Sequence, residues 1–384
     1  MHPNNNRKIN LHIYPTAFVH ETRILKETSS LARSGIFSHI YIAATAKAGL
    51  PFIEAIDKQR TVYRIKSVFK SVANNPIIKA IKFVEWSSKV FFQFVRMPIA
   101  VVSCHCLAVL PLGVCLKLFK GSKLIYETHE LETERNGWGK LKTHLAKTLE
   151  KLLFKFVNHT VVVGPSIAKW YIREYNTDKV ATVRNIPSQS DFSPNNSSIL
   201  KDHFNISSEE ILFLYQGVLN RGRGIELLLN AFSKVDSKKH IVFMGYGPLE
   251  SNIKDFSAKH RNIHHYPAVS PTELANYTQG ADVGFAVFEN TSLSYYYSCP
   301  NKLFEYILGG VVPVVSDFPD MVEIIERYKC GWKVKVDETS ITQLVNSITK
   351  EDITQHSHSA RLAKPCLSWE NEEKTLLELY KNII

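Results

Sequence analysis

The sequence predicts an α/β protein with two doubly wound domains, each built on a parallel β-sheet that is covered by helices. The chain has 384 residues, and at about 150 residues per domain this length suits two or three domains. Short apolar runs alternate with helical patterns along the whole chain. Uninterrupted apolar runs are typical of strands buried on both faces, so two series of them indicate two parallel sheets.

Six strands are expected in each half of the chain. The first series covers residues 9–14, 39–43, 99–103, 123–127, 160–163 and 179–183. The second series covers residues 211–216, 240–244, 262–266, 282–288, 311–315 and 332–336. Between them, residues 187–198 are polar and rich in turn-forming residues, as expected of a linker. Paired domains of this kind bind ligands in the cleft between them, beside the carboxyl ends of the strands.

A glycine-rich turn follows the strand at 211–216. Its sequence is Gly217-Val-Leu-Asn-Arg-Gly-Arg-Gly224, and a helical pattern begins at Ile225. Glycines let the backbone approach phosphate oxygens, a helix N-terminus offers unpaired N–H groups, and the forks of Arg221 and Arg223 suit phosphate. The turn is neither a Walker loop nor a GxGxxG fingerprint. An ordinary strand-to-helix turn with surface arginines remains the alternative.

Several motifs of the second half occur in a specific order. They are the turn ending in Arg223-Gly224, the loop Gly245-Tyr-Gly247, the segment from Tyr266 to Gly284, and Asn301-Lys-Leu-Phe-Glu305. Over roughly residues 211 to 326 this half resembles the carboxyl-terminal domain of GT-B glycosyltransferases of family 4, also described as group 1. The first half matches more loosely, through His20-Glu-Thr-Arg23 and Tyr126-Glu-Thr-His-Glu130.

The resemblance implies a GT-B fold, with two Rossmann-like domains and a cleft between them. Residues 1–187 would form the acceptor-binding domain, 188–200 the linker and 201–365 the nucleotide-sugar-binding domain. Residues 366–384 would form a helix that crosses back to the first domain.

The resemblance also assigns roles to individual residues. Arg223 matches the second cation of a pair that stabilises the leaving diphosphate, and Arg221 is expected to replace the first cation, which would fall on Val218. His129 matches a histidine that faces the sugar, and Glu305 matches a glutamate that binds ribose hydroxyls, whereas its partner glutamate would fall on Tyr297. The nucleotide-sugar site would comprise Gly217, Gly245, Gly247, Val269, Asn301, Lys302, Leu303 and Glu305, and the acceptor side His20, Arg23 and Glu130.

The expected reaction is retaining transfer of a hexose or N-acetylhexosamine from a nucleotide diphosphate sugar, with UDP as the expected nucleotide. The acceptor would be a glycan or a lipid-linked sugar in cell-surface polysaccharide synthesis. The chain has no Asp-X-Asp motif, and Cys104-His105-Cys106 has no partner pair at zinc spacing, so no metal and no cofactor are expected. Two other functions suit the same fold: a sugar-nucleotide epimerase, and a degenerate scaffold protein.

The positive charge is concentrated in the first half of the chain. The net charge is +11, and residues 1–200 hold 28 Lys and Arg against 13 Asp and Glu. No nucleic-acid-binding signature accompanies this charge, so nucleic-acid binding is the least favoured function. No signal peptide or membrane span is expected, and the chain is predicted to be cytoplasmic, with peripheral binding to the inner face of the cell membrane as one option.

Two basic amphipathic helices are expected, over residues 77–96 and 140–156. In the first, one face would carry Lys79, Lys82, Trp86, Lys89 and Arg96, and the other Ile77, Ile78, Ile81, Val84, Phe91 and Phe94. In the second, the apolar stripe would be Leu141, Leu145, Leu149, Leu152 and Phe156. Either these stripes pack on the sheet and leave the lysines solvated, or the helices lie on an anionic membrane surface.

Overall fold

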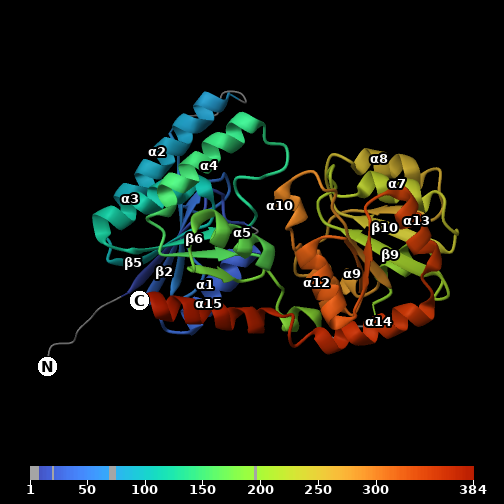
Figure 1. The fold of residues 1–384 in the computed structure, drawn as a ribbon. Helices are drawn as coiled ribbons and strands as arrows, with labels where there is room; N and C mark the ends of the chain where they lie inside the picture. Colours follow the sequence, from blue (N-terminus) through green and yellow to red (C-terminus); the bar gives the residue numbers. More distant parts are fainter. Residues whose placement is uncertain (1–7, 20, 69–74, 194–196) are drawn as a thin grey trace. The chain divides into compact units, whose positions relative to one another are not determined.

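The computed structural model describes residues 8–19, 21–68, 75–193 and 197–384 (Figure 1). The chain forms two compact units. The first unit comprises residues 1–134, 138–183 and 373–384, and the second comprises residues 135–137 and 184–372. Each unit has its own parallel sheet with helices on both faces, which confirms the predicted α/β class.

The sheet of the first unit has eight strands in the order β3-β4-β2-β1-β5-β6-β7-β8. Their bounds are β1 Ile9–Ile13, β2 His39–Thr45, β3 Ile53–Ala55, β4 Arg60–Ile65, β5 Ile99–Cys104, β6 Lys123–Thr128, β7 His159–Val162 and β8 Val180–Thr182. All six predicted strands are present, and only β3 pairs antiparallel. The sequence pattern missed β4 because Arg64 interrupts its apolar run. The Arg64 side chain is buried and donates to the carbonyl oxygens of Ala17 and Phe18.

Helices cover both faces of this sheet. Their bounds are α1 Thr22–Arg33, α2 Pro76–Phe94, α3 Leu110–Lys120, α4 Lys140–Phe154, α5 Pro165–Tyr175 and α15 Trp369–Ile383, with a short 3-10 turn at Leu107–Val109. Neighbouring residues of β2 separate the two faces: Ile42 packs with Ile24 of α1, while the ring of Tyr41 contacts Phe94 of α2.

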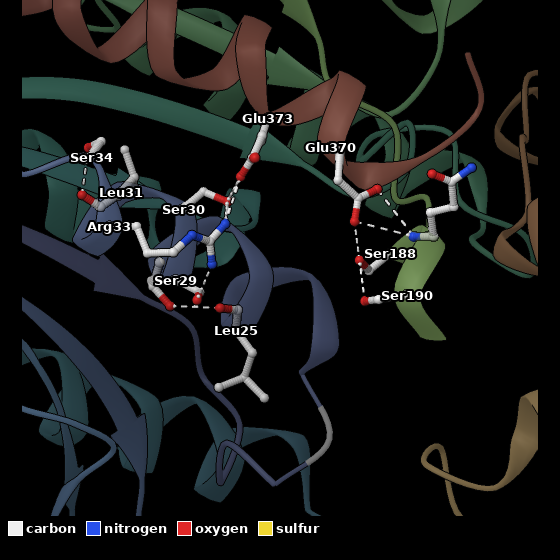
Figure 2. A network of polar contacts seen from close by, with 12 residues as sticks. Leu25, Ser29, Ser30, Leu31, Arg33, Ser34, Ser188, Ser190, Glu370 and Glu373 are labelled. Atoms are coloured by element: carbon white, nitrogen blue, oxygen red, sulfur yellow. Dashed lines mark hydrogen bonds and ion pairs between the residues drawn. The ribbon is translucent and has the colours of Figure 1, made fainter. Parts of the chain in front are cut away.

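Helix α15 is held to the first unit by polar contacts (Figure 2). The carboxylate of Glu373 accepts hydrogen bonds from the Ser30 hydroxyl at 2.5 Å and from Arg33 Nη2 at 2.8 Å. Further along the helix, the hydroxyl of Tyr380 lies 2.6 Å from Ser103 Oγ on β5. The first turn of α15 lies in the second unit, where Glu370 accepts from the backbone N–H of Gln189 at 3.1 Å (Figure 2).

Of the two arrangements expected for these helices, packing of the apolar stripe on the sheet does not hold for α4, and α2 buries a different set of residues from the predicted apolar face. In α2 the buried side chains are Trp86, Val90 and Phe94, and the Trp86 indole donates to the Ala44 carbonyl oxygen at 3.0 Å. In α4 the buried residue is Glu150, and the four leucines of the predicted stripe are exposed. Glu150 turns inward because its carboxylate accepts hydrogen bonds from three tyrosine hydroxyls, those of Tyr126, Tyr171 and Tyr175.

Among the described helices, none is both long and apolar enough to span a bilayer.

The sheet of the second unit has six strands in the order β11-β10-β9-β12-β13-β14, and all the pairings are parallel. The bounds are β9 Ile211–Gln216, β10 Lys239–Met244, β11 Ile263–Tyr266, β12 Val283–Ala286, β13 Val312–Ser316 and β14 Trp332–Val334. All six predicted strands are confirmed. The strand order reverses direction between β9 and β12, and ligands of such sheets bind beside the carboxyl ends of the strands at that point.

The helices of the second unit form two layers on this sheet. They are α6 Ile199–His203, α7 Ile225–Phe232, α8 Glu250–Ser257, α9 Leu274–Thr278, α10 Leu293–Tyr296, α11 Asn301–Gly309, α12 Pro319–Tyr328, α13 Glu338–Ser347 and α14 Lys350–Ala363, after a 3-10 turn at Gln189–Phe192. Helices α7, α8 and α13 share one apolar core with the sheet, and α9, α11, α12 and α14 share the other.

Tyr306 fixes α11 to the centre of the sheet. Its hydroxyl donates to the Leu214 carbonyl oxygen at 3.1 Å and accepts from the Gln216 backbone N–H at 3.2 Å. The ring lies over Gly284 of β12, where a Cβ atom would stand 2.5 Å from three ring atoms. Because a glycine occupies this position, the helix can approach the sheet closely.

We therefore expect Gly284→Ala to lower the thermal unfolding midpoint of the second unit, because overpacking of this kind costs about 1–3 kcal/mol. The matched control is Gly309→Ala on α11, the helix that carries Tyr306. A Cβ atom at Gly309 would meet its nearest neighbours at 3.5 Å, an ordinary contact distance. Scanning calorimetry of both variants measures the difference. Equal midpoints for the two variants would show that the packing of the Tyr306 ring does not require a glycine at position 284.

Candidate active site

The glycines of the second unit bring two loops together at the carboxyl end of β9. A Cβ atom on Gly245 would lie 1.9 Å from the Gly217 carbonyl oxygen, and one on Gly247 would lie 2.4 Å from the Leu219 carbonyl oxygen. Gly222 and Gly224 adopt positive φ angles of 78° and 72°, a region that favours glycine. Because Gly245 and Gly247 have no Cβ atom, their loop can approach the backbone of the turn at Gly217 and Leu219.

A buried lysine lies beside Gly217, and the charge of an arginine acts on it. Lys302, the second residue of α11, is only 6% exposed, and its Nζ lies 3.6 Å from the centre of the Tyr215 ring. A Cβ atom on Gly217 would lie 3.9 Å from Lys302 Nζ. The guanidinium of Arg223 lies 5.3 Å from the centre of the Phe288 ring. Within the part of the chain that the structure describes, Lys302 Nζ and Arg223 Nε have no hydrogen-bond partner.

The electrostatics of these cations point to an anionic ligand. Burial, and then the charge of Arg223, lowers the pKa of the Lys302 ammonium well below its ordinary value, although the nearby Glu305 carboxylate raises it in part. Burying a charged group without a partner costs several kcal/mol, so an anion placed between the two side chains would remove a large penalty. The helix N-terminus at Asn301 adds a favourable dipole. The arrangement is suited to a phosphate or diphosphate.

Arg221 lies outside this arrangement. Its side chain is 85% exposed, and its Nε is 3.8 Å from Glu226 Oε1. The structure therefore places Lys302, rather than Arg221, next to Arg223. Lys302 was predicted only as a general nucleotide-sugar residue, because its distance from Arg223 along the chain hides their proximity.

Glu305 is positioned by a chain of hydrogen bonds. Its carboxylate accepts from Gln216 Nε2 at 2.5 Å, and Gln216 Oε1 accepts from the Thr278 hydroxyl at 2.8 Å. The orientation of the Gln216 amide is therefore fixed, and Glu305 is held at the end of β9. Sequence reasoning missed Gln216, although one polar residue at the end of an otherwise apolar strand was a usable signal.

The other predicted residues of the second unit lie in different surroundings. Asn301 is exposed at the start of α11, and Val269 is half-buried after β11. Leu303 is fully buried in the core, so its side chain is not available to a ligand. Glu289 accepts from the Gly224 N–H at 3.2 Å and so supports the glycine turn, while Tyr297 ends α10.

In the first unit, three histidines form a hydrogen-bonded series near the carboxyl ends of β1, β5 and β6. His12 Nδ1 lies 2.8 Å from His105 Nε2, and His105 Nδ1 lies 3.3 Å from His129 Nε2. His12 and His105 are fully buried, while His129 is half-buried beside the Tyr14 ring. Sequence reasoning found His129 but missed His12, whose signal was a polar residue inside an apolar strand.

The ring hydrogens of the three histidines can be assigned by starting from Asn10, which bonds to His12. Asn10 Nδ2 donates to the Val101 carbonyl oxygen, so Asn10 Oδ1 accepts from His12 Nε2 at 2.5 Å. Burial lowers the pKa of His12 to about 3, and burial together with His12 lowers that of His105 well below its ordinary value, so both rings are neutral at pH 7. His12 Nδ1 then accepts from His105 Nε2, and His105 Nδ1 accepts from His129 Nε2. In a neutral His129 the lone pair is consequently on Nδ1.

Charged groups are buried beside these histidines. Glu27 and Glu127 are fully buried, and burial together with Glu27 raises the pKa of the Glu127 carboxyl well above its ordinary value. Arg23 Nε lies 2.8 Å from Glu27 Oε1, and Arg23 Nη1 donates to the Val183 carbonyl oxygen. Arg23 was expected on an acceptor-side surface, but its side chain is only 5% exposed and serves this buried cluster.

Among the described residues, four side chains of this cluster are near enough to one another to hold a metal ion. One ligand atom from each of four residues falls within 4.8 Å of the others, in His12, Glu27, His105 and Glu127. Two carboxylates and two imidazoles suit Zn²⁺ in number and type. However, both ring nitrogens of His12 already have hydrogen-bond partners, and Arg23 already provides a cation to Glu27. In the contacts present, the negative charge of the cluster is balanced by Arg23 on Glu27 and by a proton on the Glu127 carboxyl.

Two acceptor-side predictions remain as predictions. Glu130 follows His129 and is half-buried. His20 lies outside the described residues.

The fold is shared with solved structures of GT-B glycosyltransferases. Sucrose-phosphate synthase from Thermosynechococcus elongatus superimposes with a TM-score of 0.81 at 13% identity, over 98% of this chain and 99% of that chain. HepE from Anabaena, solved with UDP and glucose, gives a TM-score of 0.74 at 11% identity, over 98% and 100% of the two chains. The catalytic domain of starch synthase IV from Arabidopsis thaliana, bound to ADP and acarbose, gives 0.71 at 11% identity, over 98% and 99%.

Residues 197–364 match the family model described as glycosyl transferases group 1. This match lies within the second unit, and the solved structures show that the chain has the GT-B fold, as the sequence resemblance predicted. Comparison with curated protein sequences gives no match.

We expect the neutral His12 to make stability depend on pH. Its folded pKa of about 3 lies below the unfolded value of about 6.5, so the unfolded chain binds more protons between these values. The free energy of unfolding therefore falls as the pH falls from 7 to 5. In His12→Gln this loss should be smaller by about 2 kcal/mol, at 1.36 kcal/mol per pKa unit.

Denaturant titrations at both pH values measure this effect. The control is His144→Gln, at an exposed position on α4, which should keep the wild-type pH dependence. The same loss in His12→Gln and wild type would contradict the neutral, buried state of His12.

Proposed function

We propose that the protein is a retaining glycosyltransferase of family 4 that transfers a hexose or N-acetylhexosamine from a nucleotide diphosphate sugar. The observation that carries this proposal is the pair of cations Lys302 and Arg223, because Lys302 Nζ and Arg223 Nε lack hydrogen-bond partners among the described residues. HepE with UDP and glucose, and starch synthase IV with ADP, support a nucleoside diphosphate as the ligand. We propose UDP as the nucleotide.

The residues divide the work as follows. Arg223 and Lys302 stabilise the charge that develops on the leaving diphosphate as the glycosidic bond breaks. Glu305, oriented by Gln216, accepts hydrogen bonds from the ribose hydroxyls. The acceptor oxygen bonds to the anomeric carbon on the same face from which the diphosphate oxygen leaves, and the leaving phosphate oxygen takes the acceptor proton. The configuration is therefore retained, and no separate carboxylate base is needed. The proposed acceptor is a glycan or lipid-linked sugar of a cell-surface polysaccharide.

The test of the donor site uses three variants. UDP and UDP-sugars should raise the thermal midpoint of the wild type, and Arg223→Ala or Lys302→Met should abolish this shift. Where transfer can be measured, each should lower kcat/KM by about 10²–10³, the usual effect of removing one donor to a developing oxyanion. Arg221→Ala is the matched control and should keep most of the shift, because its side chain is exposed.

Some outcomes would overturn the proposal. If no nucleoside diphosphate stabilises the wild type, the cations serve another ligand. If Arg221→Ala is as damaging as Arg223→Ala, the diphosphate is bound on the surface of the turn. Conversion of the nucleotide sugar without an acceptor would favour the epimerase activity.

We expect the reaction to proceed without a metal ion and with retention. EDTA should leave the transfer rate unchanged, because Arg223 and Lys302 provide the positive charge that a metal otherwise gives to the diphosphate. Proton NMR of the product should show the same anomeric configuration as the donor. Loss of activity in EDTA with recovery by a divalent cation would contradict this mechanism, as would an inverted product.

A further inference from the structure

One face of the first unit exposes a concentration of large apolar side chains. They lie on three helices and are between 40% and 74% exposed: Ile77, Ile81, Val84 and Phe92 on α2, Leu118 and Phe119 on α3, and Leu141, Leu145, Leu149 and Leu152 on α4. Helix α3 packs against both α2 and α4 (Figure 1), and the Phe91 and Phe119 rings are 5.2 Å apart. We call these ten residues the apolar ridge.

Packing within the unit does not account for the ridge. In α4 the usual arrangement is reversed: Glu150 is buried among the hydroxyls of three tyrosines, and the four leucines face solvent. The leucines recur at positions 141, 145, 149 and 152, so they form one stripe along the helix. A group of exposed apolar side chains of this size is typical of an interaction surface, whereas single exposed apolar side chains are ordinary.

The charge around the ridge is positive. Helices α2, α3 and α4 together contain nine lysines and two glutamates. Both glutamates are already engaged, since Glu150 is hydrogen-bonded to tyrosines and Glu85 pairs with Lys89 at 2.5 Å. Lys140, Lys142 and Lys151 are exposed beside the leucine stripe of α4. Lys147 pairs with Glu134 outside these helices. The surface therefore offers an apolar stripe bordered by a net excess of lysines.

We propose that the apolar ridge docks the first unit on a lipid bilayer with anionic headgroups. The leucines would enter the boundary between headgroups and acyl chains, while the lysine side chains reach the phosphate level, as in interfacial amphipathic helices. A second copy of this chain is disfavoured, because it would place lysines against lysines. Docking deepens the proposed function, on which this part rests, by assigning a lipid-linked acceptor at the membrane surface.

The experiment measures co-sedimentation of the full chain with vesicles. Binding should be strong to phosphatidylcholine vesicles that contain phosphatidylglycerol, weak to pure phosphatidylcholine, and reduced by added salt. Leu145→Glu combined with Leu152→Glu should weaken binding by more than about tenfold, since each leucine loses a favourable transfer from water. Lys142→Gln and Lys151→Gln should each weaken it by about fivefold. Leu362→Glu, at a site on α14 that is 69% exposed, is the matched control and should bind as the wild type does.

The outcomes separate this inference from the proposed function. Thermal unfolding and the UDP-induced shift should be unchanged in the ridge variants, which shows that they fold and keep the donor site. Absence of vesicle binding, equal binding to neutral vesicles, or ridge variants that bind as the wild type does would each overturn the proposal. A dimer in solution that Leu145→Glu dissociates, without vesicle binding, would assign the ridge to self-association. If UDP does not raise the thermal midpoint but the vesicle results are as expected, the proposed function is overturned and the proposed docking surface is retained.

Discussion

The proposed donor site depends on how Tyr306 joins α11 to the end of β9. The Tyr306 hydroxyl bonds to backbone groups of Leu214 and Gln216, and its ring lies in the space that Gly284 leaves open. This fixes the first turn of α11 beside the carboxyl end of the central strand. Lys302 and Glu305 precede Tyr306 on the same turn, so the contact that anchors the helix also sets the positions of the cation and the carboxylate.

Buried polar groups determine both candidate sites, in two different ways. In the first unit, Asn10, His12 and His105 satisfy each other in series, and the assignment of hydrogens at one end fixes the tautomer at the other. In the second unit, Lys302 Nζ and Arg223 Nε are left without hydrogen-bond partners among the described residues. Satisfied groups specify a single arrangement, whereas unsatisfied cations favour an incoming anion. Arg23 Nε and the Glu27 oxygens of the first unit also lack hydrogen-bond partners among the described residues, but these two charges form an ion pair with each other. We therefore propose the second unit as the diphosphate site.

Helix α4 shows how a buried carboxylate can control a surface. Three tyrosine hydroxyls, from β6 and α5, hold the Glu150 side chain inside the unit. Once Glu150 points inward, helix geometry places the leucines at 141, 145, 149 and 152 outward. A polar contact in the core thus produces an apolar exterior, and the lysines between the leucines make that exterior basic. The proposed membrane contact follows from this inversion.

The sequence by itself determined the two parallel sheets and the glycine turn, and it named Arg223, Glu305 and His129 as candidate site residues. Apolar runs, glycines and an ordered set of motifs are local signals, and twelve strands were found from them. It did not find the three-residue strand β3. It also missed β4, because Arg64 breaks the apolar run and is satisfied by carbonyl oxygens that only the fold supplies.

Tertiary structure alone decided which residues act together. The pairing of Lys302 with Arg223, the support of Glu305 by Gln216 and the burial of Arg23 join positions that are far apart in the sequence. The same holds for α4, since helical periodicity locates an apolar stripe but does not say which side faces the sheet. That choice was made by Glu150, whose hydrogen-bond partners lie on other elements, and desolvation allows the carboxylate to be buried only where those partners are present.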